Sequence, residues 1–156
     1  MSQGFVIAPD DLQADDVLTL LTRHREELRG HSPADACHVM SADRLRESDV
    51  TFFVARKDGE LAAVGALKQL DPATGEIKSM RAAGSWRGKG AGAAILAHLI
   101  AEARQRGYRE VGLETGRSAL FADAHALYVR SGFAECDAFG PYRSGDFTLC
   151  MRMALS

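Results

Sequence analysis

Apolar side chains recur every three or four positions in three stretches of the chain, which is the spacing of a helix with one buried face. Ser41 is placed to cap a fourth, shorter helix. Asp10 or Asp11 caps the first helix, and Gly107 follows the end of the third. The predicted helices span about residues 11–30, 41–47, 90–106 and 118–130.

Runs of β-branched and aromatic residues lie between these helices and predict strands. Asp58-Gly59 is a hairpin signal, and a second turn over residues 71–75 makes the three central strands an antiparallel meander. The strand–helix–strand unit after the meander is expected to be a parallel, right-handed crossover. The predicted strands span residues 3–8, 51–56, 61–67, 76–82, 110–115, 133–139 and 147–153, and the last two form a terminal hairpin.

Length and composition fit one soluble α/β domain over residues 1–156. The 156 residues are 46% hydrophobic and 26% charged, and the net charge is −2. So small a net charge favours neither nucleic acid nor an acidic membrane as a partner. No apolar run reaches the roughly 18 residues of a membrane helix, and the N-terminus lacks the basic region of a signal peptide. A cytoplasmic location is therefore expected.

The cysteines and histidines show no pattern of a disulfide framework or a metal site. Cys37, Cys136 and Cys150 are far apart in the sequence and form no CxxC pair, so free thiols are expected. The five histidines show no metal-ligand spacing with cysteine or with one another. No bound metal is expected.

One glycine-rich turn carries the strongest functional signal. Residues 87–92 are Arg-Gly-Lys-Gly-Ala-Gly and lie between a predicted strand and a predicted helix. The first N–H groups of a helix have no intrahelical partner and carry a partial positive charge. Glycines remove the side chains that would keep a ligand away from those N–H groups. The turn is therefore predicted to bind the pyrophosphate of a nucleotide-bearing cofactor.

Three kinds of phosphate site compete for this turn. A phosphate-binding lysine loop requires GxxxxGK followed by Ser or Thr, and the chain contains no such string. The loose form of a dinucleotide fingerprint is met by Gly88, Gly90 and Ala93, with Glu110 or Glu114 as the ribose-binding acid. That fold places its fingerprint after the first strand of a parallel array, however, whereas a hairpin meander precedes this turn. The third kind is a coenzyme A pyrophosphate site.

Residues 76–133 resemble the GNAT N-acetyltransferase superfamily, which matches the third kind of site. The cofactor motif of that family, Arg/Gln-x-x-Gly-x-Gly/Ala, corresponds to residues 87–92, and its later Tyr-x-x-x-Gly-Phe motif corresponds to residues 128–133. The strings at 76–81 and 113–116 are similar to a bacterial subgroup of acetyltransferases without assigned acceptors. The resemblance implies a GNAT fold, with a mixed sheet of about six to seven strands, an antiparallel N-terminal meander, a central βαβ crossover and about four helices.

The resemblance further implies that acetyl-CoA is the co-substrate and lies in a V-shaped split between the strands at 76–82 and 109–115. The amides of the pantetheine arm would bond to the backbone of Met80 and Ala82. The pyrophosphate would sit on the backbone N–H groups of the turn at positions 87 and 89–92. The cofactor-binding residues expected on this basis are Met80, Arg81, Ala82, Arg87, Gly88, Lys89, Gly90, Ala91, Gly92 and Tyr128.

The implied reaction is direct attack of an amine on the thioester, followed by departure of the CoA thiolate. An alkylammonium has a pKa of about 10.4 and must lose a proton first, so a carboxylate acting through water is needed as general base. Glu76 is the first candidate and Glu114 the second, while Tyr128 matches the general acid of the family. Two simpler interpretations stay open, with Glu76 as an exposed strand-end glutamate and Tyr128 as a core residue.

The expected acceptor is a small amine or amino-acid-like molecule, and arginine side chains in its pocket favour one that carries a carboxylate. The resemblance also favours a homodimer. The alternatives to an enzyme are a non-catalytic acyl-CoA-binding module and, less favoured, a dinucleotide-binding domain. The residues expected to bind the acceptor are His31, His38, Arg81, Tyr142 and Arg143, in a pocket that includes residues 28–40.

Overall fold

The computed structural model of the chain describes residues 4–31, 45 and 47–155. The strands are β1 Val6–Pro9, β2 Val50–Lys57, β3 Glu60–Asp71, β4 Thr74–Ala82, β5 Glu110–Gly116, β6 Ala134–Cys136, β7 Ala138–Phe139, β8 Tyr142–Arg143 and β9 Thr148–Ala154. The helices are α1 Asp15–His31, α3 Ala91–Gln105 and α4 Ala122–Ser131, and the short 3₁₀ turns are η2 Gly84–Trp86 and η3 Ala119–Phe121. In this part of the chain, no helix is long and apolar enough to cross a membrane.

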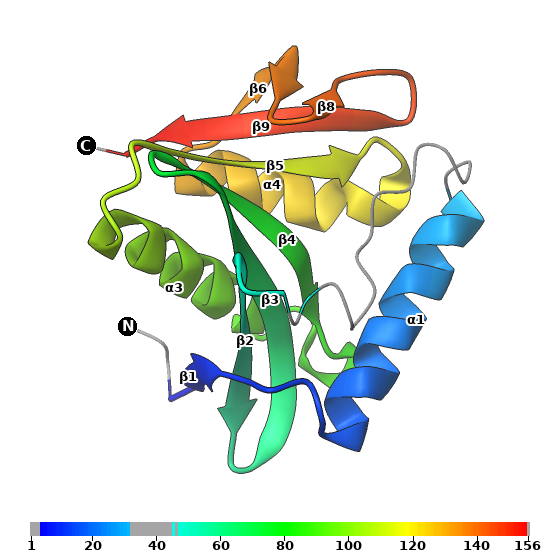
Figure 1. Cartoon of the computed structure of the whole chain (residues 1–156). Coiled ribbons are helices and arrows are strands. Elements are labelled where there is room, and N and C mark those ends of the chain that lie inside the picture. Colours follow the sequence, from blue (N-terminus) through cyan, green and yellow to red (C-terminus); the bar gives the residue numbers. More distant parts are fainter. Residues whose placement is uncertain (1–3, 32–44, 46, 156) are drawn as a thin grey trace.

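Seven of these strands form one mixed sheet in the order β1, β2, β3, β4, β5, β9, β6, and β7 pairs separately with β8 (Figure 1). The meander, the parallel β4–α3–β5 crossover and the α/β class are confirmed. The hairpin signal at Asp58-Gly59 is also confirmed, because both residues have the positive φ angles (53° and 82°) that a primed two-residue turn requires. The helix predicted at 41–47 lies largely outside the described residues.

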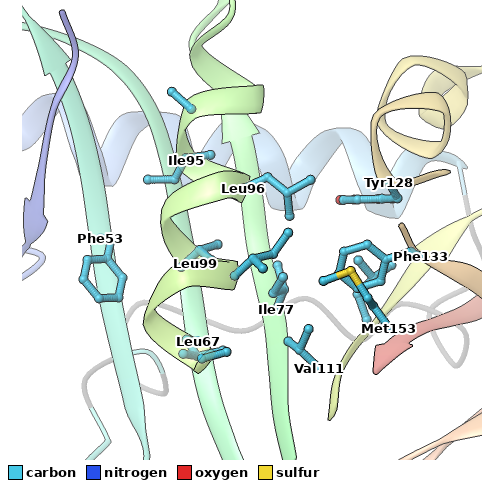
Figure 2. Close-up of a cluster of buried hydrophobic side chains, with 14 of the residues drawn as sticks. Phe53, Leu67, Ile77, Ile95, Leu96, Leu99, Val111, Tyr128, Phe133 and Met153 are labelled. Carbon is cyan, nitrogen blue, oxygen red and sulfur yellow. The ribbon is translucent and has the colours of Figure 1, made fainter. Parts of the chain in front are cut away.

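The helices cover the two faces of the sheet separately, with α1 on one face and α3 and α4 on the other (Figure 1). Phe52 and Phe53 are neighbours on β2 and join different cores, because successive side chains of a strand point to opposite faces. The core under α1 consists of Leu12, Val17, Leu20, Leu21, Leu45, Val50, Phe52, Val54, Leu61, Val64 and Ala66. The core under α3 and α4 includes Phe53, Leu67, Ile77, Ile95, Leu96, Leu99, Val111, Tyr128, Phe133 and Met153 (Figure 2).

Strand β3 allows α3 to lie very close to the sheet. A Cβ atom at Gly65 would lie 2.9 Å from Leu99 Cδ1 and 3.3 Å from Ile95 Cγ1. Both distances are shorter than ordinary van der Waals contact between carbon atoms. Glycine at this position therefore sets the height of α3, and with it the position of the turn that begins the helix.

Strands β4 and β5 separate part of the way along their length. Their parallel register pairs only residues 74–76 of β4 with residues 110–112 of β5. Beyond this point β4 pairs only with β3, and β5 pairs only with β9. The V-shaped split implied by the family resemblance is therefore present between the outer halves of the two strands.

A bulge bends β4 at the point where the two strands have separated. Val64 of β3 lies opposite Arg81, whereas Ala66 lies opposite Lys78, so β4 carries one extra residue between these pairs. Ser79 lies in that interval and has a φ of 54°. A bulge of this kind redirects the side chains that follow it.

The prediction of one continuous strand over residues 133–139 is wrong. The chain pairs with β9 as β6 but then leaves the sheet, and β7 pairs with β8 inside the segment predicted to be a connecting loop. The ring of Phe139 lies over Gly112 of β5, where a Cβ atom would be 2.4 Å from it. This packing of an aromatic ring against a bare strand surface explains why β7 turns back over β5 rather than continuing along β9.

Candidate functional site

A cavity of about 390 Å³ lies where the outer half of β4 meets η2, the start of α3, and α4. Its wall includes residues of the glycine-rich turn and of the bulged part of β4. In the sequence, η2 lies between these two segments. The cavity is lined by His24, Met80, Arg81, Ala82, Trp86, Arg87, Gly88, Gly90, Gly92, Ala93, Phe121, Asp123, Ala124, Leu127 and Arg130.

The glycine-rich turn presents bare backbone to this cavity. Gly88 and Gly90 have φ angles of 74° and 88°, in the left-handed region that residues with a Cβ atom rarely adopt. Gly90 caps α3 without a side-chain hydrogen bond, and the first helical bond runs from Ala94 N–H to the Gly90 carbonyl. The N–H groups of residues 91–93 therefore have no partner inside the helix, which is the arrangement that binds anions.

Two of the predicted phosphate-binding amides are already engaged. The N–H of Arg87 donates to the Gly84 carbonyl at 3.4 Å, and the N–H of Lys89 donates to the Trp86 carbonyl at 3.3 Å. Of the backbone N–H groups predicted to bind the pyrophosphate, those of residues 90–92 therefore remain available.

The side chains of the turn add positive charge around the cavity. Arg87 lines the cavity, and its guanidinium lies 3.8 Å from a carboxylate oxygen of Glu27 on α1. Lys89 is not among the lining residues, and its ammonium lies 5.6 Å from the centre of the Trp86 ring. Trp86 also lines the cavity and packs edge-on against Phe5.

The bulge at Ser79 distributes the next residues of β4 between the two faces of the sheet. Met80 packs against the core under α3, and Arg81 pairs with Glu27 of α1 on the other face. Met80, Arg81 and Ala82 all line the cavity, as expected of cofactor-binding residues. Their contacts with a cofactor stay a prediction.

His24 lines the cavity beside Arg81 and is a site residue that the sequence pattern does not predict. Its side chain is 9% exposed, and its Nδ1 lies 3.3 Å from Nη1 of Arg81. Burial, with a smaller contribution from the charge of Arg81, lowers the pKa of His24 to about 4, so the ring is neutral at pH 7. His24 shares the apolar stripe of α1, and such a stripe indicates only a buried face.

We expect His24 to make the protein less stable as the pH falls from about 6.5 to about 4. In the unfolded chain its pKa is about 6.5, so between these values the unfolded state binds more protons than the folded state. When the pH has fallen to about 4, the free energy of unfolding is therefore lower by about 3 kcal/mol because of His24. The charged groups around the ring are Arg81 and, through it, Glu27 and Arg87.

Urea unfolding at pH 7 and at pH 4.5 measures this effect against a His24→Gln variant, which cannot titrate. The wild-type chain should lose about 2–3 kcal/mol more than the variant between the two pH values. Equal losses would show that the ring is not buried in its neutral form.

Tyr128 lies in the core between α3 and α4 and is 6% exposed. Figure 2 shows it pointing from α4 toward Leu96 of α3. The centre of its ring lies 5.9 Å from that of the Phe133 ring. Burial raises its pKa to about 12. Ala124 and Leu127 of the same helix line the cavity, but Tyr128 is not among the lining residues. Its hydroxyl is thus kept protonated at neutral pH.

The interpretation of Glu76 as an exposed strand-end residue is wrong, because its side chain is buried and only 1% exposed. One carboxylate oxygen lies 3.0 Å from the Lys78 ammonium, which also donates a 2.6 Å hydrogen bond to the Tyr142 hydroxyl. The other oxygen, Oε1, is buried and has no hydrogen-bond partner among the described residues. Glu114 is half-buried on β5 opposite Cys150, and neither glutamate lines the cavity.

The predicted acceptor residues fall into separate places. Tyr142 lies beside Lys78, and Arg81 lies beside His24. Arg143 is exposed, and as the neighbour of Tyr142 on β8 its side chain projects the other way. His38 lies outside the described residues, and of His31 only the backbone is described, as the end of α1. Within the described ranges, no three His, Cys, Asp or Glu side chains are grouped to hold a metal ion.

Comparison with known proteins gives a family match over most of the chain. The model of the Acetyltransferase (GNAT) family matches residues 14–133. Uncharacterized N-acetyltransferase YsnE of Bacillus subtilis (strain 168) is 41% identical over 133 residues, which cover 85% of this chain and 88% of YsnE. Uncharacterized N-acetyltransferase YedL of Escherichia coli (strain K12) is 38% identical over 139 residues, which cover 89% of this chain and 87% of YedL.

A solved structure shows that the fold is shared as well. The structure of a GNAT family acetyltransferase from Elizabethkingia anophelis, with acetyl-CoA bound, superposes with a TM-score of 0.70. The two sequences are 19% identical, and the match covers 98% of this chain and 99% of the other. At this identity the likeness establishes the arrangement of helices and strands.

Proposed function

The chain belongs to the acetyltransferase (GNAT) family and is an acyltransferase, and we propose that it transfers the acetyl group of acetyl-CoA to the amine of a small molecule. The observation that carries this proposal is that the turn at residues 87–92 forms part of the cavity wall. There α3 begins with backbone N–H groups that have no partner inside the helix. We further propose that residues 1–156 form a single domain of this kind.

Acetyl-CoA would lie across the split between β4 and β5. Its pyrophosphate would accept hydrogen bonds from the backbone N–H groups of residues 90–92, with Arg87 close enough to add charge. Its pantetheine arm would run along Met80 and Ala82, where β4 has no β5 partner. At the other end, the split is closed where residues 74–76 of β4 pair with residues 110–112 of β5.

In the reaction, the amine nitrogen attacks the thioester carbon, the carbon–sulfur bond breaks, and an amide and a CoA thiolate form. The proton of the incoming ammonium passes, through water, to a carboxylate of Glu76 or Glu114. Tyr128 passes its hydroxyl hydrogen to the departing sulfur and regains one from the nitrogen, which loses its second proton as the amide forms. Since a thiol has a pKa of about 8.5 and burial raises that of Tyr128 to about 12, hydrogen bonding to the developing thiolate is favoured over early complete transfer.

Release of free thiol tests this function directly. The protein would be mixed with acetyl-CoA and a panel of small amines, and an acceptor-dependent rise in CoA thiol is the expected result. Thermal melting with acetyl-CoA, NAD and NADP should show stabilisation by acetyl-CoA alone, because only a ligand of the native state raises the melting temperature. Stabilisation by NAD or NADP instead would favour the dinucleotide-binding alternative.

A non-catalytic acyl-CoA-binding module is the second candidate. Two observations favour it, since Glu76 is tied to Lys78 and Tyr128 does not line the cavity. Stabilisation by acetyl-CoA without thiol release on any amine would support this candidate and contradict the transferase.

The two candidate bases are distinguished by their glutamine variants. If Glu76 is the base, Glu76→Gln should lower kcat/KM by about 100-fold at pH 7, while Glu114→Gln should leave it nearly unchanged. The loss should shrink as the pH approaches 10, because a growing share of the amine is then already deprotonated. A pH–rate profile measures this, and a loss of the same size at every pH would indicate damage to the Lys78 pair instead.

A further inference from the structure

The α1 side of the cavity holds a histidine whose hydrogen-bonding role is fixed by its neighbour. A guanidinium can only donate hydrogen bonds, so Nδ1 of His24 must accept the one from Arg81 Nη1. The neutral ring then carries its hydrogen on Nε2. Among the described residues, the hydrogen bond found for the ring is the one at Nδ1, which leaves Nε2–H for a ligand, and His24 lines the cavity.

Arg81 carries a second unused donor at the same place. Its Nη1 is engaged with His24 and its Nη2 with Glu27, whereas its Nε–H is buried and has no partner among the described residues. A buried donor without an acceptor is unfavourable. Two unsatisfied N–H groups on adjacent side chains of one cavity wall therefore suit a ligand with two oxygen acceptors.

The charge at this wall favours an anion over a cation. Arg81 and Arg87 share the single carboxylate of Glu27, and His24 is neutral, which leaves one net positive charge among the four groups. An ammonium would be repelled here, whereas a single carboxylate would neutralise the excess charge and accept both hydrogen bonds.

We propose that His24 and Arg81 bind a carboxylate of the acceptor, so that the acceptor is a small molecule carrying both an amine and a carboxylate. This inference rests on the acetyl transfer proposed above and adds to it the class of acceptor. It assigns to His24, on α1, a role in acceptor selection.

Matched pairs of acceptors test the inference, namely free amino acids and the corresponding amino acid amides. The amide keeps the amine and the side chain but removes the negative charge. The wild-type protein should use the acids with a kcat/KM at least about 10-fold higher than that for the amides. His24→Leu should lower kcat/KM for the acids by about 10-fold, mainly through KM, and change that for the amides less than about 2-fold.

His24→Gln is the control, because its amide group accepts from Arg81 and still offers an N–H donor, so it should keep most of the preference. Melting temperature and acetyl-CoA affinity are measured for each variant. If His24→Leu lowers kcat/KM equally for acids and amides, His24 does not bind the acceptor carboxylate. If it lowers acetyl-CoA affinity, His24 and Arg81 bind the cofactor instead. Turnover of amides or simple amines but not acids would refute this inference alone, whereas no turnover of any amine by a protein that binds acetyl-CoA would refute the proposed transferase as well.

Discussion

Replacing Gly92 with aspartate is expected to abolish acetyl-CoA binding and to leave the protein at least as stable as before. Gly92 is the second residue of α3 and lines the cavity, and a Cβ atom there would meet only Leu127 Cδ2, at an ordinary 3.7 Å. A carboxylate in the first turn of a helix stabilises it by about 0.3–1 kcal/mol, and replacing glycine inside a helix is also favourable. The same carboxylate would occupy the position of the pyrophosphate and repel it.

We expect Gly92→Asp to weaken acetyl-CoA binding by at least about 100-fold, or about 3 kcal/mol, as measured by titration calorimetry. Gly92→Asn is the matched control, since it has the same shape without the charge, and it should weaken binding less. Circular dichroism and melting temperature would show that both variants fold. Unchanged affinity in Gly92→Asp would place the pyrophosphate elsewhere and remove the main support for the proposed function.

Replacing Tyr128 with phenylalanine should lower kcat by about 100-fold and leave acetyl-CoA affinity within about 2-fold, because only the hydroxyl that we propose as the general acid is lost. Since burial raises the pKa of Tyr128 to about 12, this hydroxyl stays protonated at every lower pH. The wild-type kcat should therefore not fall on its account until the pH approaches that value. Steady-state kinetics from pH 7 to pH 10 measure both effects.

Tyr108→Phe is the matched control for this prediction. Tyr108 is also a buried tyrosine, 5% exposed, but its hydroxyl donates to Gln69 on β3 at 3.3 Å and it does not line the cavity. This variant should keep the wild-type kcat. If Tyr128→Phe keeps it too, Tyr128 is a core residue, as the simpler interpretation of the sequence held.

Features that depend on local backbone geometry could be predicted from the sequence. The turn at Gly88 and Gly90 and the hairpin at Asp58-Gly59 need positive φ angles, and the residues that tolerate such angles are few. The spacing of apolar residues in α3 is likewise a local property, and the helix predicted at about residues 90–106 is found at Ala91–Gln105. These features are enough to predict the fold class and the position of the glycine-rich turn that we propose binds phosphate.

Features that depend on partners far along the chain could not be predicted. The burial of Glu76 requires Lys78 and, 64 residues beyond it, Tyr142. The bulge at Ser79 is defined only by the register of β4 against β3. His24 differs from its apolar neighbours on α1 only because Arg81 reaches it from β4. In each case the sequence contains the residues but not the contact that gives them a role.

The short pairing of β4 with β5 has a mechanical consequence. The sheet consists of two nearly independent plates, β1–β4 and β5–β9–β6, which share a backbone ladder over only three residues of each strand. What holds the plates at a fixed angle is α3, whose Ile95, Leu96 and Leu99 belong to a core that includes residues of both plates. The aperture of the split is thus governed by side-chain packing in this core rather than by backbone hydrogen bonds, and the contact of Leu99 with Gly65 fixes how closely α3 approaches the β1–β4 plate.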